Sequence, residues 1–196
     1  MLKISYIKAS NDDKLLLLGI IEEGESRHYT ISYETYASIG SPEARTEIGE
    51  QEMAAIRYAD ELYRAEKKAL SLLAFADNNV RALRQKLIRA GFSRDVSEQI
   101  CTKMISIGYI NESRQLERII LSEANGKLRG PLKIMPYVVS KGYSSTEARR
   151  IIQELCDGGE IDFDKNAELL LAKKLPDDAT DEDRKKLLYR NGYKIC

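Results

Sequence analysis

The sequence contains few of the residues that most often carry out chemistry. It has one histidine, three cysteines and no tryptophan among 196 residues. Cys101, Cys156 and Cys196 are an odd number at wide spacing, and no Cys-X-X-Cys pair occurs. This pattern disfavours both a disulfide framework and a zinc site, and it predicts reduced thiols in a cytoplasmic protein.

Motifs of common catalytic sites are also missing. Neither GxxxxGK followed by Ser or Thr nor GxGxxG occurs, which disfavours a loop dedicated to nucleotide phosphates. His28 lies far along the chain from every cysteine, so we interpret it as a strand residue rather than half of a Cys-His pair. The acidic pairs Asp12-Asp13 and Asp177-Asp178 are more typical of solvated loops than of metal ligands. We therefore predict that the protein is not an enzyme and uses no cofactor or metal.

Long hydrophobic runs and an overall excess of charge are absent as well. The run LLLLGII at residues 15–21 has the length of a strand rather than of a membrane span, and residues 1–10 lack the apolar region of a signal peptide. Lys and Arg together number 31, as do Asp and Glu, so only local charge is informative. Residues 1–50 carry five basic and nine acidic groups, whereas residues 78–94 carry five basic and none acidic.

The N-terminal residues predict a small sheet. Residues 2–7 and 28–33 alternate between apolar and polar side chains, and residues 15–21 form a continuous apolar run. A turn is expected at residues 22–26, with Gly24 in an unusual backbone conformation. A short helix should follow and end at Gly40, after which Ser41-Pro42 has the form of a helix N-cap with proline at the first position.

The remaining residues predict helices. Residues 49–76 form a long helical stretch whose candidate inward positions are Met53, Ile56, Leu62 and Tyr63. After cap residues at 77–79, the segment NVRALRQKLIRAGFS places Val80, Leu83, Leu87 and Ala90 on one apolar face and Arg81, Gln85 and Arg89 on the opposite face. Gly91 is expected to end this helix in a left-handed conformation, with Phe92 folding back onto Leu87 as in a Schellman motif.

The same segment recurs along the chain. A shift of 51 residues aligns Gly91, Phe92 and Ser93 with Gly142, Tyr143 and Ser144, and a shift of 50 then reaches Gly192-Tyr193. Helix starts agree with the alignment, since Ser144 and Thr180 each begin a capping-box pattern and Gly130-Pro131 begins a helix. We therefore predict a mainly α protein of tandem three-helix repeats, two full and the third truncated, with a small N-terminal β-strand segment. The proposed divisions are residues 1–48 for the β-segment, 49–65 for a linking helix, 66–110 and 111–161 for full repeats, and 162–196 for a partial repeat.

The middle helix of each repeat lacks acidic residues. Stacked repeats would line one surface with positive charge, which favours binding to phosphates or to an acidic protein groove. The basic faces do not discriminate between these two partners. Our candidate contact residues are Arg81, Arg84, Lys86, Arg89, Lys127, Arg129, Lys133, Lys141, Arg184, Lys185 and Arg190.

The order of these segments resembles the RecX family of regulatory proteins. The resemblance covers about residues 60–196 and rests on LSLLAFADNNVRALRQKLIRAGFS, then GYINESRQLERIILSEANGKLRGPLKI, then GYSSTEARRII. It implies tandem three-helix units that bind the RecA recombinase filament and usually inhibit its activities in DNA repair, with contacts to single- or double-stranded DNA possible. We expect the protein to be a monomer. The sequence departs from the family pattern at Pro136, which should kink its helix or remove a backbone bond, and in lacking the last helix of the third repeat.

Two alternatives stay open from the sequence. A direct DNA-binding module or transcription regulator would also use basic three-helix units, although no recognition helix can be chosen. The aromatic residues Phe92, Tyr143 and Tyr193 could stack on bases, but their common place after a helix-ending glycine favours a role in the cap.

Overall fold

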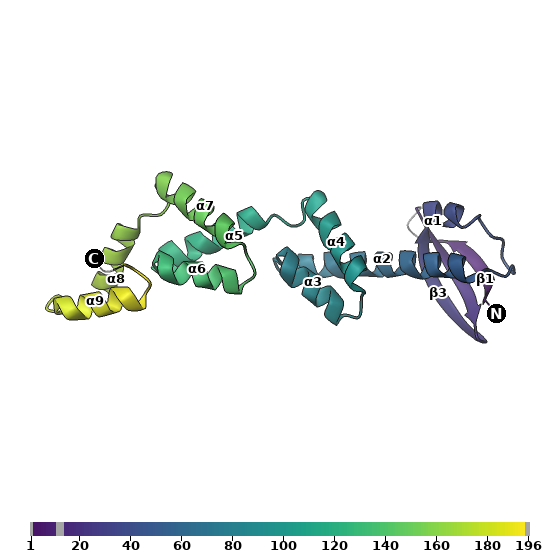
Figure 1. The fold of residues 1–196 in the computed structure, drawn as a ribbon, viewed down its shortest axis with the longest axis horizontal. Helices are drawn as coiled ribbons and strands as arrows, with labels where there is room; N and C mark the ends of the chain where they lie inside the picture. The colour runs from purple at the N-terminus through teal and green to yellow at the C-terminus, as the bar shows by residue number, and fades with distance from the viewer. Residues whose placement is uncertain (1, 11–13, 195–196) are drawn as a thin grey trace. The chain divides into compact units, whose positions relative to one another are not determined.

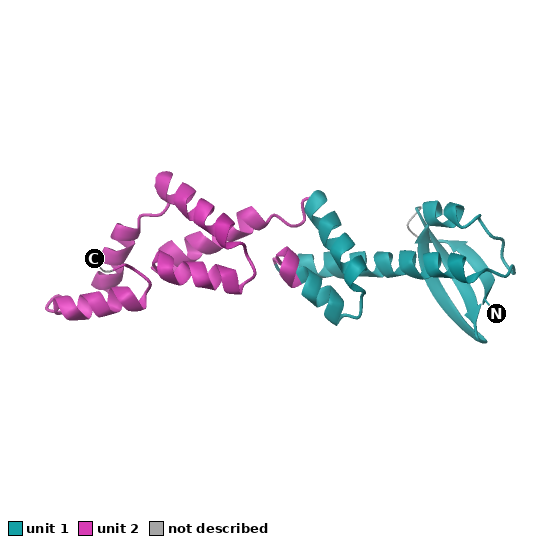
Figure 2. Ribbon diagram, in the orientation of Figure 1, with its two compact units in different colours: residues 1–76, 83–107 teal, residues 77–82, 108–196 magenta. Residues whose placement is uncertain are grey.

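The structure, a computed structural model, describes residues 2–10 and 14–194 (Figure 1). Asp12, Asp13 and Cys196, for which the sequence predicts a loop and a reduced thiol, lie outside the described residues. The chain is mainly helical with a small N-terminal sheet, which confirms the predicted fold class. It forms two compact units (Figure 2): the first contains residues 1–76 and 83–107, and the second contains residues 77–82 and 108–196. The division into repeats remains our proposal for its organisation.

The N-terminal sheet consists of β1 (Leu2–Ala9), β2 (Leu15–Glu22) and β3 (Glu25–Ser32), which are antiparallel neighbours in that order. Glu23 and Gly24 join β2 to β3 with φ angles of 51° and 88°, so the predicted turn at Gly24 is confirmed. A two-residue turn with positive φ at both central residues has a twist that matches the twist of the two strands it joins.

The prediction that a helix begins at Ser41-Pro42 is wrong. Helix α1 (Tyr33–Ser38) ends as expected, but Ser41 has a φ of 50°, which is incompatible with the extended conformation of an N-cap. Residues 45–48 instead run along β1, where the Ile4 amide donates to Thr46 O (3.0 Å) and the Ile48 amide to Leu2 O (3.0 Å). The open edge of β1 offers unpaired backbone groups, and this segment satisfies them.

Helix α2 (Glu50–Phe75) covers the sheet and continues beyond it. Met53 and Ile56 are fully buried against Leu18, Ile20 and Ile31, as the sequence predicts. The other two expected inward residues, Leu62 and Tyr63, are only half-buried. Their places in the core are taken by Ala65 and Ala69, where α4 (Arg94–Ser106) packs against α2. Alanine lets two helix backbones approach closely, which a hydrophobicity pattern does not reveal.

The second unit is helical. Its core collects Leu116, Ile120, Ile134, Val138 and Ile151, among others. Pro136 is exposed, and α6 continues across it, because only one backbone donor is lost and that donor would face solvent. The elements of this unit are α5 (Glu112–Leu121), the π-helical turn η1 (Ser122–Gly126), α6 (Pro131–Ser140), α7 (Ser145–Asp157), α8 (Phe163–Lys174) and α9 (Asp181–Arg190).

The three middle helices, α3 (Val80–Arg89), α6 and α9, end in the same way. Gly91, Gly142 and Gly192 have φ angles of 94°, 99° and 86°. The amide of the aromatic residue that follows each glycine donates to a carbonyl five residues earlier, at distances of 3.2, 3.2 and 3.1 Å. These bonds define a Schellman motif, so the predicted caps are confirmed in all three repeats. The N-caps at Asn79, Ser144 and Thr180 are confirmed as well.

Candidate functional site

The second unit gathers basic side chains around the end of η1. The Lys127 amide donates to Ser122 O (3.1 Å), which closes the π-helical turn, and Leu128 then takes a φ of 51°. The Arg129 amide returns to Glu123 O (3.0 Å). A wide turn followed by a left-handed residue folds the chain back on itself, so Lys127 and Arg129 both lie beside Glu123. π-Helical turns of this kind are frequent at functional sites.

Glu123 holds these two cations in place. Its side chain is 3% exposed and forms ion pairs with Lys127 (Nζ–Oε1, 2.6 Å) and with Arg129. The cations themselves stay accessible, since their side chains are 51% and 32% exposed. A buried carboxylate therefore positions two half-exposed positive groups and neutralises only one of their charges.

Tyr137 on α6 lies at the centre of the cluster. Lys127, Arg129 and Lys141 place their charged groups 5.8, 5.8 and 5.4 Å from the centre of its ring. Lys133 lies one helical turn before Tyr137, and Lys141 one turn after it, so all three share a face of α6. We call the cluster of Glu123, Lys127, Arg129, Lys133, Tyr137 and Lys141 the Tyr137 basic patch. Its four basic residues outnumber its one carboxylate, so we propose it as a candidate site for an anion.

Replacing Glu123 by glutamine tests this role directly. Glu123→Gln should lower the free energy of unfolding by about 1–3 kcal/mol, because two charge-assisted hydrogen bonds to a buried group are lost while the half-exposed cations regain water. Urea denaturation measures the change. Glu182→Gln is the matched control, since its ion pair with Lys186 is largely exposed and should contribute almost nothing. Equal stability of Glu123→Gln and wild type would show that Glu123 does not organise the patch.

The predicted contact residues of α3 divide into two groups. Arg81 belongs to the second unit, and its side chain packs against Gly142, where an added Cβ would lie 2.8 Å from Arg81 Cδ. Asn79 donates from Nδ2 to Lys141 O (2.9 Å), so this part of α3 adjoins the Tyr137 basic patch. Arg84 lies in the first unit and forms an ion pair with Glu98 (2.9 Å). Lys86 and Arg89, in the same unit, are exposed.

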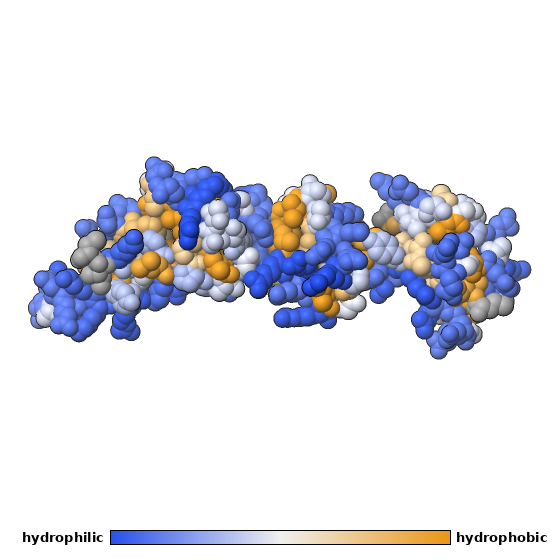
Figure 3. All heavy atoms as spheres, in the orientation of Figure 1, coloured by the Kyte–Doolittle hydropathy of each residue, from blue (hydrophilic) through white to orange (hydrophobic). Residues whose placement is uncertain are grey.

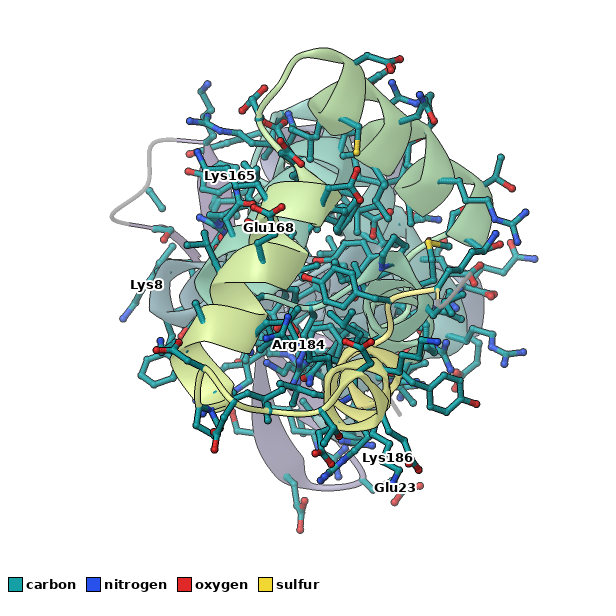
Figure 4. The ribbon with its side chains drawn as sticks, turned by 90° about the vertical axis from the view of Figure 1, so that its left-hand side faces the viewer. Lys8, Glu23, Lys165, Glu168, Arg184 and Lys186 are labelled. Atoms are coloured by element: carbon teal, nitrogen blue, oxygen red, sulfur yellow. The ribbon has the colours of Figure 1, made fainter. Side chains whose placement is uncertain are left out.

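The predicted contact residues of α9 form no comparable cluster. The Arg184 side chain extends from α9 into the space beside α8 and donates to Asp177 O (3.4 Å), whereas Lys186 lies at the outer edge of α9 (Figure 4). Lys185 and Arg190 are exposed. The prediction that each middle helix lacks acidic residues is wrong for α9, because this helix begins at Asp181 and its first turn contains Asp181, Glu182 and Asp183. In the other two repeats the pattern was an incomplete guide to charge, because Glu98 and Glu123 reach the basic residues from other segments.

The structure also shows a junction between repeats that the sequence pattern did not predict. The turn at Asn191 and Gly192 accepts hydrogen bonds from the amides of Gly130 (2.8 Å) and Leu132 (3.0 Å), which are otherwise unpaired donors at the start of α6. At the equivalent place one repeat earlier, Lys141 O accepts a hydrogen bond from the Asn79 side chain, and the Arg81 side chain packs against Gly142. The recurring Gly-aromatic pair is the sequence feature that marks this junction. It ends a helix, and it also lies where one repeat packs against the next.

The aromatic residues after these glycines serve the same junctions. Tyr193 is 6% exposed, donates to Leu128 O (3.1 Å), and has its pKa raised to about 12 by burial. Tyr143 donates to Gln115 Oε1 (3.1 Å). Both hydroxyls therefore have partners within the protein, and the buried ring of Tyr193 is not available to stack on a base. Gln115 and Asn166 occupy equivalent positions in two repeats, and both side-chain amides are buried. Gln115 donates to Asn78 O, and Asn166 donates to Ala124 O.

Other candidate residues have structural surroundings. His28 lies on β3, as predicted, and its Nδ1 is 2.9 Å from the Tyr6 hydroxyl. Cys101 and Cys156 are thiols, and burial raises the pKa of both. Among residues 2–10 and 14–194, no group of three His, Cys, Asp or Glu side chains could hold a metal ion. Within the same described residues, no helix has both the length and the apolar character to cross a membrane.

The fold and the site define a mainly helical repeat protein with a small N-terminal sheet and a basic surface patch. No protein-family model matches the chain. It is 30% identical over 142 residues to regulatory protein RecX of Clostridioides difficile (strain 630), covering 72% of this chain and 64% of that protein. It is 23% identical over 155 residues to regulatory protein RecX of Bacillus cytotoxicus, covering 79% of this chain and 56% of that protein. The chain thus matches less than two thirds of the length of these relatives.

Solved structures agree with this assignment at the level of the fold. A crystal structure of regulatory protein RecX matches with a TM-score of 0.73 and 18% identity, covering 99% of this chain and 95% of that one. The crystal structure of RecX from Lactobacillus salivarius matches with a TM-score of 0.58 and 20% identity, covering 69% and 90%. The chain is thus similar in sequence to regulatory proteins RecX and shares the fold of RecX crystal structures, in agreement with the resemblance of its repeats.

Proposed function

We propose that this protein binds the RecA filament and inhibits its ATPase, strand exchange and growth without catalysing a reaction of its own. Similarity to regulatory proteins named RecX supports a binding role, and that name points to RecA. The observation that carries the proposal is the Tyr137 basic patch, in which Lys127, Arg129 and Lys141 surround one ring. We expect it to act in the cytoplasm as a monomer.

The patch is suited to an anionic surface of the filament. The three cationic groups around the Tyr137 ring, beside one carboxylate, repel each other, and an incoming phosphate or carboxylate relieves that repulsion. Lys and Arg on phosphates provide affinity without reading base sequence, which suits a regulator of a filament that forms on any DNA. The partly buried Glu123 pairs fix the geometry before binding, so less conformational entropy is lost on contact.

The ATPase activity of RecA tests the proposal. RecA assembled on single-stranded DNA should hydrolyse ATP more slowly when a stoichiometric excess of this protein is present. The reaction without this protein provides the reference rate. A RecA rate that stays unchanged, together with no co-sedimentation of this protein with filaments, would remove the inhibitory function.

Direct binding to DNA is the second candidate function, and the same patch favours it. If the Tyr137 basic patch contacts phosphates of naked DNA, the affinity should fall with salt at a log–log slope of about −0.9 for each phosphate neutralised. Weak binding that does not depend on salt would exclude this option and leave the protein surface of the filament as the partner.

A further inference from the structure

The three middle helices share an exposed apolar residue that the basic faces do not explain. Ile88, Val139 and Tyr189 occupy equivalent positions, since shifts of 51 and 50 residues relate them. Their exposed fractions are 42%, 42% and 70%. Each lies one residue after a residue of the helix's inner face, namely Leu87, Val138 and Leu188. We call Ile88, Val139 and Tyr189 the apolar anchors.

The helix cap does not require an apolar side chain at this position. In each Schellman motif the anchor residue contributes only its carbonyl, which accepts from the glycine amide at 3.0, 2.9 and 3.0 Å. The hydrophobic contact of that motif involves the preceding residue instead. Polar residues would therefore serve the cap equally well, so the repeated choice of a large apolar residue needs another explanation.

Recurrence separates the anchors from other exposed apolar residues. Figure 3 shows hydrophobic side chains reaching the surface of both units among charged ones. Single exposed residues are ordinary and carry no meaning. Ile105 aligns with the half-buried Cys156, and Leu169 aligns with the ion-paired Arg118, so neither exposure recurs. Within residues 66–194, which the structure describes, only the anchor position exposes a large apolar side chain in all three repeats.

The charges beside two of the three anchors indicate the kind of partner. Ile88 has Arg84 one turn before it and Arg89 directly after it, and Tyr189 has Lys185 and Arg190 at the same offsets. Val139 has Met135 and Ser140 at these offsets, so no cation flanks it there. A phosphate backbone has no apolar surface to receive Ile88 or an equivalent valine. The combination of an apolar side chain with neighbouring cations fits an apolar pocket edged by carboxylates on a protein.

We propose that each repeat inserts its apolar anchor into an equivalent pocket of a protein filament built from identical subunits. Three equivalent anchors require three equivalent pockets. An array of identical subunits is the kind of partner that presents the same pocket repeatedly. This inference rests on the proposed function and deepens it, because it assigns contacts with filament protein to residues outside the Tyr137 basic patch.

The test compares two triple variants that bear the same kind of change. Ile88→Gln, Val139→Gln and Tyr189→Gln together should weaken binding to RecA filaments roughly 100-fold, because loss of one interface anchor weakens binding by about fivefold or more. The control triple, Ile105→Gln, Tyr109→Gln and Leu169→Gln, removes exposed apolar residues that do not recur and should bind as wild type does. Fluorescence anisotropy of labelled protein against RecA filaments on poly(dT) measures each affinity, and circular dichroism verifies each fold.

The outcomes distinguish this inference from the proposed function. Wild type that fails to bind filaments overturns both. If the wild type binds and the anchor variant binds as well as the wild type or as well as the control triple, the inference alone is overturned. Analytical ultracentrifugation adds a further check: self-association of wild type that disappears in the anchor variant would assign these residues to a second copy of this chain and overturn the proposed partner. Selective loss of filament binding in a monomeric anchor variant supports it.

Discussion

Reversing the charge of Lys133 and Lys141 should weaken binding to DNA-loaded RecA filaments roughly 100-fold. Both side chains belong to the Tyr137 basic patch and are exposed, and neither is ion-paired to Glu123. Lys133→Glu with Lys141→Glu therefore changes the sign of the patch while leaving the buried pairs intact. If the patch contacts phosphates, the log–log dependence of affinity on salt should also become shallower by about two. Fluorescence anisotropy over a series of salt concentrations measures both quantities.

A variant with the same change in net charge provides the control. Lys173→Glu with Lys174→Glu alters two exposed lysines at the end of α8, away from Tyr137 in the sequence and in a different helix. Equal losses in the two variants would mean that net charge, rather than the patch, governs binding. Undiminished binding by the patch variant would remove the Tyr137 basic patch from the interface. The helical circular dichroism signal should be unchanged in both, since exposed charge substitutions alter stability little.

Replacing Gly192 by alanine should be the most damaging change to the packing of the third repeat. Gly192 has a φ of 86°, and an added Cβ would lie 2.5 Å from Lys133 N and 2.7 Å from Lys133 Cβ. The variant therefore combines backbone strain with a steric clash at the docking point on α6, and the free energy of unfolding should fall by about 3 kcal/mol. Urea denaturation measures the loss, and hydrogen exchange should show reduced protection in α8 and α9.

Gly91 provides a control at the equivalent position of the first repeat. Its φ is 94°, but nothing lies within 4 Å of an added Cβ. Gly91→Ala therefore introduces the strain without the clash, and it should lower the free energy of unfolding by about 1 kcal/mol. If the two variants are equally unstable, the turn at Gly192 is not tightly docked, and the junction between the repeats must depend on other contacts such as the Tyr193 hydroxyl.

Local sequence signals predicted the helices and their ends well. Gly91, Gly142 and Gly192 end helices because only a residue without a Cβ adopts positive φ at no cost, and that rule needs no knowledge of the rest of the chain. The N-caps at Ser144 and Thr180 follow from hydrogen bonds to residues three positions ahead. Ser41-Pro42 has the same local form, yet it starts no helix, because the next residues pair with β1, which lies about 40 residues earlier.

The candidate site was predicted only in part. The sequence identified Lys127, Arg129, Lys133 and Lys141 as basic residues of one repeat, and the structure brings them around Tyr137. It did not identify Tyr137 or the role of Glu123, since a scan for acidic residues within a helix does not see a carboxylate that folds in from η1. Glu98 reaches Arg84 in the same way.

The sequence by itself determined the periodic features of this protein: the apolar faces, the glycine caps, the repeats and the resemblance to the RecX family. These features depend on residues within one or two helical turns, where backbone geometry converts spacing directly into direction. The tertiary structure decided which charges are neutralised, which apolar residues stay exposed and where one repeat meets the next. The Tyr137 basic patch, the turn of Gly192 on Gly130 and the exposure of Val139 all depend on contacts between residues far apart in the chain, which local spacing does not specify.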